Sequence, residues 1–165
     1  MQTSIAENRT KEIAKSKILI VDDIPENIMV IGNILYRAGL LVSYASDGIE
    51  ALSIISHQKP DLILLDIQMP RMNGFELCSE LKKTEEYKDI PIVFVTAHND
   101  KGNINKGFHA GGVDYITKPV NSEELLHRVN THLELKTKTD TLQQINAIKK
   151  KKVQQRTQDL QKANE

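Results

Sequence analysis

The sequence predicts an α/β protein built on a five-stranded parallel β-sheet with helices on both faces. Three short runs, at residues 18–21, 62–65 and 92–95, are apolar at every position, which is typical of strands buried on both sides. Segments with apolar residues three and four positions apart lie between these runs, and this spacing indicates amphipathic helices. Because strands and helices alternate, the strands are expected to be parallel and joined by helical crossovers.

Two weaker strands, at residues 41–45 and 113–116, bring the expected number of strands to five. The helices are expected at residues 26–37, 48–56, 74–83, 100–110 and from 122 onward. Five βα units within about 120 residues imply a doubly wound, flavodoxin-like (βα)5 sheet, whose ligands bind at the C-terminal ends of the strands.

Local signals mark several helix ends. Gly39 is a stop signal for the first helix, and Asp47 is a plausible N-cap for the second. Asn121 or Ser122 can cap the fifth helix, whose first turn carries two glutamates, as the helix dipole favours. The element boundaries therefore rest on capping chemistry as well as on periodicity.

The last predicted helix is expected to continue far beyond the domain. There is no glycine after Gly112 and no proline after Pro119, so a helix from residue 121 to residue 165 would be roughly 68 Å long. A thin apolar stripe runs along it, formed by Leu135, Leu142, Ile145, Val153 and Leu160. Either a two-stranded coiled coil or a helix that frays in solution fits this stripe. We expect a flexible segment at 1–16, a domain at 17–133 and a helical extension at 134–165.

Charge is balanced overall, with 22 basic and 22 acidic residues, but it is unevenly distributed. From residue 134 onward eight Lys/Arg stand against four Asp/Glu, which leaves 14 against 18 before it. A basic tail can contact nucleic acid or a membrane, but a lysine run at 149–152 is more typical of the solvated side of a helix. We therefore expect neither a nucleic-acid partner nor membrane insertion.

The expected location is the cytoplasm. Cys78 is the single cysteine and cannot form an intramolecular disulfide, which suits a reducing compartment. It lies in a helical pattern and is interpreted as a small buried filler. No apolar stretch approaches the roughly 20 residues needed to span a bilayer, and residues 1–16 contain no apolar signal-peptide core.

Polar side chains gather at one edge of the predicted sheet. Asp22 and Asp23 follow the first strand, Asp66 the third, Thr96 the fourth and Lys118 the fifth. In a parallel sheet these positions lie at the same end, so they are expected to form one pocket. Three close carboxylates would raise one another's pKa unless nearby cations balance their negative charge. Mg²⁺, which prefers oxygen ligands, and the lysine ammonium are the natural candidates.

Each of these residues also has an ordinary interpretation. The Asp22–Asp23 pair can cap a helix that starts at Pro25, and Asp66 can be a turn residue before a Met-Pro pair. Thr96 alone carries no signal, and a lysine before proline is commonly solvated. The joint arrangement after four separate strands favours the functional interpretation.

Four ordered motifs resemble the response-regulator receiver family of two-component signalling. They are Ile-Val-Asp-Asp at 20–23, Leu-Asp-Ile-Gln-Met-Pro-Arg-Met-Asn-Gly at 65–74, Val-Thr-Ala at 95–97 and Asp-Tyr-Ile-Thr-Lys-Pro at 114–119. The resemblance covers about residues 17–133 and is highly specific, because the motifs agree in order and in spacing.

The resemblance implies a role for each matching residue. Asp66 would be the phosphoacceptor, taking a phosphoryl group from a histidine kinase or a phosphotransfer protein. Asp23, Asp66 and the backbone carbonyl of Gln68 would bind Mg²⁺ directly, and Asp22 would act mainly through water. Lys118 would supply charge to the phosphoryl oxygens during transfer.

The resemblance also implies a switch. Thr96 would donate its hydroxyl to the phosphoryl group, and Tyr115 would fill the space that Thr96 vacates, which changes the surface of the fourth and fifth βα units. A half-buried strand aromatic is the ordinary alternative for Tyr115. The bond from Lys118 to Pro119 is expected to be cis. Gln68 and His98 would border the attacking water and influence the lifetime of the phosphoryl group. A residue at the rim of the site is the ordinary alternative for His98.

Other classes fit less well. A haloacid-dehalogenase-like phosphatase needs a second aspartate two positions after Asp66, where Gln68 stands, and a nucleotide-binding fold needs a glycine-rich loop after the first strand. A phosphorylation-independent interaction and dimerisation module is the remaining alternative. As a receiver, the chain is expected to catalyse only its own phosphorylation and dephosphorylation.

The helical extension carries the expected output. It resembles linkers that lead to histidine kinase, diguanylate cyclase or related phosphodiesterase domains. Our hypothesis is that it pairs in a parallel homodimer and transmits the state of Asp66 along the helix.

Overall fold

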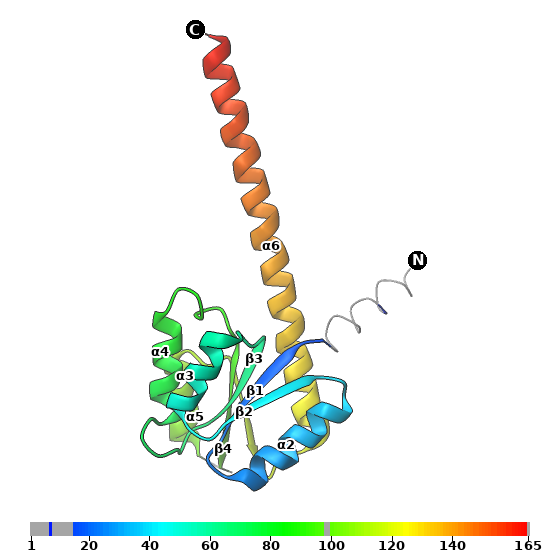
Figure 1. The fold of residues 1–165 in the computed structure, drawn as a ribbon, viewed down its shortest axis with the longest axis vertical. Helices are drawn as coiled ribbons and strands as arrows, with labels where there is room; N and C mark the ends of the chain where they lie inside the picture. Colours follow the sequence, from blue (N-terminus) through cyan, green and yellow to red (C-terminus); the bar gives the residue numbers. More distant parts are fainter. Residues whose placement is uncertain (1–6, 8–14, 98–99, 165) are drawn as a thin grey trace. The chain divides into compact units, whose positions relative to one another are not determined.

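The computed structural model describes residues 7, 15–97 and 100–164, and it contains a single sheet with alternating helices (Figure 1). The elements are β1 (Lys17–Val21), α2 (Pro25–Arg37), β2 (Leu41–Ala45), α3 (Gly48–His57), β3 (Leu62–Asp66), α4 (Gly74–Lys83), β4 (Ile92–Ala97), α5 (Lys101–Ala110), β5 (Asp114–Lys118) and α6 (Ser122–Ala163). The five strands are parallel in the order β2-β1-β3-β4-β5. The predicted flavodoxin-like sheet is confirmed.

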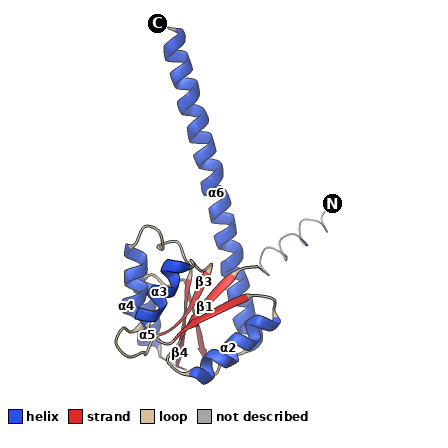
Figure 2. Ribbon diagram, in the orientation of Figure 1, coloured by secondary structure: helices blue, strands red, loops and turns tan. Residues whose placement is uncertain are grey.

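The sheet divides the core into two layers. Ile18 and Ile20 of β1 pack into a layer with α2 and the first turns of α6, whereas Leu19 and Val21 pack into a layer with α3 and α4. This alternation follows from the two-residue period of a strand. Figure 2 shows the strands between these helices. β1 and β3, which lie inside the sheet, are therefore covered on both faces.

Most predicted helix boundaries are close to the observed ones. Asp47 caps α3 by accepting the N–H of Glu50 at 2.8 Å, and Asn121 accepts the N–H of Glu124 at the start of α6 at 3.1 Å. No side chain caps α2, so the capping interpretation of Asp22 and Asp23 is wrong. The strand predicted at 113–116 instead runs from Asp114 to Lys118, because its pairing with β4 continues to Lys118.

Cys78 is buried in α4, as expected for a packing residue. Its Sγ donates to the backbone oxygen of Ala110 at 3.4 Å. Burial raises the pKa of the thiol to about 11, so the thiolate is scarce at neutral pH.

The chain divides into two compact units, one up to Leu133 and one from Glu134 to Glu165. The second unit is helical, and it exposes Leu135, Leu142, Ile145, Ile148, Val153 and Leu160. α6 runs without a break from Ser122 to Ala163, so the predicted helical continuation is observed. The flexible segment predicted at 1–16 lies outside the described residues except at 7, 15 and 16. Within the described part, no helix is both long and apolar enough to cross a membrane.

Candidate functional site

The carboxyl ends of the strands bring three aspartates together. Asp22 and Asp23 follow the last residue of β1, and Asp66 is the last residue of β3, the strand beside it. One carboxylate oxygen from each residue lies within 4.8 Å of the others. Two segments that are distant in sequence thus supply the three aspartates, and Lys118 from β5 lines the same pocket as Asp23 and Asp66.

Lys118 provides the cationic side of this pocket. Its Nζ lies 3.3 Å from Oδ1 of Asp66 and 3.6 Å from Oδ2 of Asp22. The bond from Lys118 to Pro119 is cis, as the resemblance to the receiver family implies. One ammonium therefore lies near two of the three clustered carboxylates, so among the described residues the negative charge of this cluster exceeds the positive charge.

Asp22 and Asp23 differ in their surroundings. Asp22 is 1% exposed, and its two oxygens accept the N–H of Ile24 at 2.9 Å and the side-chain N–H of Asn27 at 3.2 Å. Asp23 is exposed and lines the mouth of the pocket. Asp22 is held by the protein itself, whereas Asp23 presents its carboxylate to whatever enters from solvent.

The electrostatics act most strongly on Asp66, which is 7% exposed. Burial, followed by the negative charge of Asp22, raises the pKa of the Asp66 carboxyl from 3.8 to about 6. The positive charge and hydrogen bond of Lys118 oppose this shift without cancelling it. A cation added beside Asp66 would lower the pKa again, because it would favour the ionised carboxylate.

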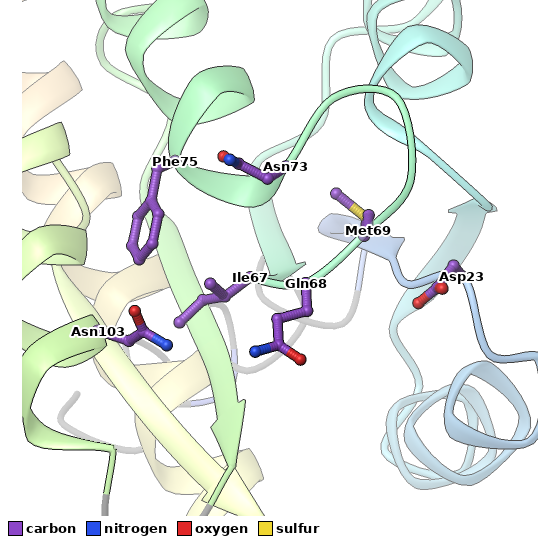
Figure 3. Close-up of a pocket in the computed structure, with 7 residues that line it drawn as sticks. All are labelled: Asp23, Ile67, Gln68, Met69, Asn73, Phe75 and Asn103. Atoms are coloured by element: carbon purple, nitrogen blue, oxygen red, sulfur yellow. The ribbon is translucent and has the colours of Figure 1, made fainter.

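The loop after β3 folds back close to Asp66. Gly74 donates its N–H to the backbone oxygen of Ile67 at 2.9 Å, and a Cβ on Gly74 would overlap the backbone oxygen of Asp66. The absence of a side chain here allows α4 to begin directly against the end of β3. Figure 3 shows Gln68 on this loop, between Asp23 on one side and Asn103 on the other.

Thr96 connects the acidic pocket with a neighbouring crevice. It is 3% exposed, and it lines both the pocket that contains Asp66 and Lys118 and the crevice that contains Tyr115. The ring of Tyr115 is half-buried and meets the ring of Phe108 edge-on, with centroids 6.1 Å apart. Thr96 and Tyr115 therefore line the same crevice, so a movement of the Thr96 side chain would alter the space beside Tyr115.

Two pocket residues were not predicted from the sequence. Asp100 caps α5 by accepting the N–H of Asn103 at 3.3 Å, and both residues line the acidic pocket. Their place in the sequence could have indicated this, because α5 starts just after β4, at the edge of the sheet where the aspartates gather. His98, which was expected near the attacking water, lies outside the described residues.

The donor set fits a small hard cation. Three carboxylates meet at one point, and the loop that carries Gln68 borders the same hollow. Oxygen ligands of this kind suit Mg²⁺, which keeps some of its waters and needs only one or two carboxylates. The pocket opens to solvent through exposed Asp23, so an ion and a phosphoryl group can both enter.

A (βα)5 sheet with an acidic cluster and a lysine at the carboxyl ends of its strands defines a receiver domain. The chain belongs to the response regulator receiver domain family, whose model matches residues 18–130. This family serves two-component signalling, so the resemblance drawn from the four motifs is confirmed.

Relatives carry the same domain in longer proteins. The chain is 37% identical to "Response regulator PleD" of Caulobacter vibrioides over 129 residues, which cover 78% of this chain and 28% of that protein. It is 38% identical to a "Probable cyclic di-GMP phosphodiesterase" of Vibrio cholerae over 135 residues, covering 80% of this chain and 30% of that protein. The chain thus spans under a third of these two relatives.

A solved structure supports the fold independently. The chemotaxis response regulator CheY4 of Vibrio cholerae superposes with a TM-score of 0.68 at 31% identity, covering 72% of this chain and 98% of that one. The likeness spans nearly the whole of that chain, so it supports the receiver fold of the first unit.

Asp66→Asn is expected to stabilise the metal-free protein above pH 6. The folded-state pKa of Asp66 lies above its usual value, so ionisation of this carboxyl on raising the pH from about 4 to 6 disfavours the folded state. The variant should gain on the order of 2 kcal/mol at pH 8, and this gain should vanish below about pH 4. Denaturant unfolding at several pH values, without divalent ions, measures it.

Glu86→Gln is the matched control, since Glu86 is an exposed carboxylate and its neutralisation should leave the unfolding free energy nearly unchanged at every pH. A gain from Asp66→Asn that is equally large at pH 4 and pH 8 would contradict the electrostatic explanation.

Proposed function

We propose that this chain is a phosphoacceptor receiver that takes a phosphoryl group on Asp66 from a phosphohistidine of a histidine kinase or a phosphotransfer protein. The observation that supports it is the position of Asp66. Its buried carboxylate lines the acidic pocket, 3.3 Å from the Lys118 ammonium and beside two further carboxylates.

In the transfer step, a carboxylate oxygen of Asp66 attacks the phosphorus atom. The new oxygen–phosphorus bond forms as the phosphorus–nitrogen bond breaks, and the bonding electron pair leaves with the imidazole. Asp66 needs no general base, because a carboxyl with a pKa of about 6 is mostly ionised at pH 7. The Lys118 ammonium is close enough to Asp66 to offset charge on the transferred group.

Asp23, Asp66 and the backbone oxygen of Gln68 would hold Mg²⁺. Asp22 would contribute through water, since both of its oxygens already accept protein hydrogen bonds. Bound Mg²⁺ would supply positive charge to the phosphoryl oxygens and reduce the repulsion between the phosphoryl group and the carboxylates.

The proposed switch uses the two hollows that share Thr96. A phosphoryl group on Asp66 adds about −1.5 to −2 charge and acceptor oxygens, and the Thr96 hydroxyl donates to one of these oxygens. Movement of Thr96 toward Asp66 leaves space in the crevice beside Tyr115. Tyr115 turns inward, and the surface of the fourth and fifth βα units changes.

A network of contacts links Tyr115 to the first turns of α6. The guanidinium of Arg128 lies 5.7 Å from the centroid of the Tyr115 ring and binds Asp114 at 2.6 Å and Glu124 at 3.1 Å. His132, one turn further along α6, lies 2.9 Å from Asp114. When Tyr115 leaves its place, Arg128 loses a cation–π partner, and α6 receives the signal.

The helical extension, residues 134–165, carries the signal onward. Leu135, Leu142, Val153 and Leu160 lie within about 20° of one line on a straight helix, and each is more than half exposed in the single chain. A second copy of the helix covers this stripe and forms a homodimer. A kinase, diguanylate cyclase or phosphodiesterase domain is the output to which such a helix leads, and the receiver itself catalyses only its own modification.

The proposed location is the cytoplasm. Cys78 is unpaired and buried, and an unpaired thiol suits a reducing compartment.

Incubation with a small phosphodonor such as acetyl phosphate and Mg²⁺ should add one phosphoryl group to the native chain. Asp66→Asn should remove the modification, because the attacking oxygen is lost. Lys118→Met should slow it on the order of a hundredfold, because the ammonium near Asp66 is lost. Intact mass over time measures both.

Lys83→Met is the control, since Lys83 is exposed on α4 and should leave the rate unchanged. Modification of Asp66→Asn at the native rate would show that another residue is the acceptor.

Charges placed on the apolar stripe should separate the dimer. Leu142→Glu combined with Val153→Glu puts four carboxylates at the pairing surface of two helices, where burial is costly. Sedimentation at increasing concentration should show a dimer for the native chain and a monomer for this variant.

Gln144→Glu combined with Gln158→Glu adds the same charge about 140° or more around the helix axis from the stripe, so this control should remain a dimer. A native chain that stays monomeric at high concentration would sink the proposed pairing.

A further inference from the structure

An ion pair ties the loop between β3 and α4, residues 67–73, to the start of α3. Nη2 of Arg71 lies 2.5 Å from Oδ2 of Asp47. The other carboxylate oxygen of Asp47 accepts the N–H of Glu50 and so caps α3. One carboxylate therefore fixes both a helix start and the loop that follows the proposed acceptor.

A packing contact reinforces this tie. The side chain of Met72 lies so close to the backbone of Gly48 that a Cβ at Gly48 would come within 2.8 Å of the Met72 sulfur. Met72 also donates its N–H to the backbone oxygen of Pro70 at 2.8 Å, which makes a tight turn. The loop thus touches α3 through two successive residues, one charged and one apolar.

Because Asp47 is buried, its carboxylate needs hydrogen-bond donors or a cation within the protein. Asp47 is 4% exposed, and a buried carboxylate without sufficient donors is costly. Arg71 itself is largely exposed, with a φ of 67° in the left-handed region that side chains other than glycine rarely adopt. The ion pair and the Met72 contact therefore hold Arg71 in a backbone conformation that it would not choose alone.

We propose that Arg71 and Asp47 form a loop latch that positions the backbone oxygen of Gln68 for the divalent cation. This inference rests on the metal site of the proposed function. Gln68 lies three positions before Arg71 on the same loop, and it lines the acidic pocket with Asp23 and Asp66. Figure 3 shows the loop running from Gln68 past Met69 to Asn73 at the start of α4.

The latch acts by preorganisation. Gly74 anchors the far end of the loop to the end of β3, but Gly74 alone does not fix where the residues between them point. With Arg71 held on Asp47, the backbone of Gln68 is already placed at the pocket before an ion arrives. Without the latch, the loop must be ordered when the ion binds, and this ordering lowers the affinity. Arg71 and Asp47 are thus positioning residues that do not themselves contact the ion.

The affinity for Mg²⁺ itself, measured by titration calorimetry on the full chain, tests the latch. Arg71→Gln and Asp47→Asn should each raise the Kd by roughly three- to tenfold, less than the loss typical of a residue bonded directly to a ligand. The double variant should bind as weakly as either single variant, because both remove the same contact. Arg71→Lys should restore part of the affinity.

These substitutions separate positioning from folding. Asparagine caps helices as well as aspartate does, so Asp47→Asn keeps the cap of α3, and Arg71 is exposed. Amide hydrogen exchange without metal should be faster at residues 68–73 in Arg71→Gln and Asp47→Asn, and unchanged in the strands. Arg37→Gln, at the exposed end of α2, is the control for loss of a positive charge.

The possible failures are distinct. A native chain that binds Mg²⁺ while Arg71→Gln and Asp47→Asn bind it equally well would overturn the latch and leave the metal site intact. Additive losses in the double variant would also overturn it, since the two residues would then act separately. A native chain that binds no Mg²⁺ would overturn the metal site, and the latch with it.

Discussion

The carboxyl edge of the sheet concentrates more negative charge than the protein neutralises, and the rest of the site follows from this imbalance. Parallel pairing of β1 with β3 places Asp22, Asp23 and Asp66 together, and the ammonium of Lys118 lies near Asp22 and Asp66. Burial then raises the pKa of Asp66 to about 6. The structure is therefore organised around a site whose charge is best balanced when a cation is bound.

Two sets of contacts lead away from this site. Toward β4 and β5, Thr96 borders both the acidic pocket and the crevice of Tyr115, and Arg128 joins Tyr115 to α6. Toward α3, the loop after β3 is tied by Arg71 to Asp47. In the first set, Tyr115 and Arg128 are half-buried, which suits transmission, whereas in the second set Asp47 is buried, which suits fixation.

Much of this arrangement could be predicted from the sequence, because it depends on local patterns. Apolar runs predicted the buried strands, and single residues such as Asp47 predicted helix caps. Parallel topology then placed Asp66 and Lys118 at one edge. The contacts of Arg71 with Asp47 and of Arg128 with Asp114 could not be predicted, because they join side chains distant in sequence whose orientations depend on the completed fold. The position of Asn103 in the pocket was missed for the same reason. The sequence predicted where its helix begins but not which way its side chains point.

Proton release on Mg²⁺ binding tests the central electrostatic claim most directly. Titration calorimetry in buffers of different ionisation enthalpy counts the protons released per ion. With the pKa of metal-free Asp66 at about 6, the account predicts release of about half a proton per ion at pH 6 and almost none at pH 8. Binding at pH 6 without proton release, or no binding at either pH, would contradict it.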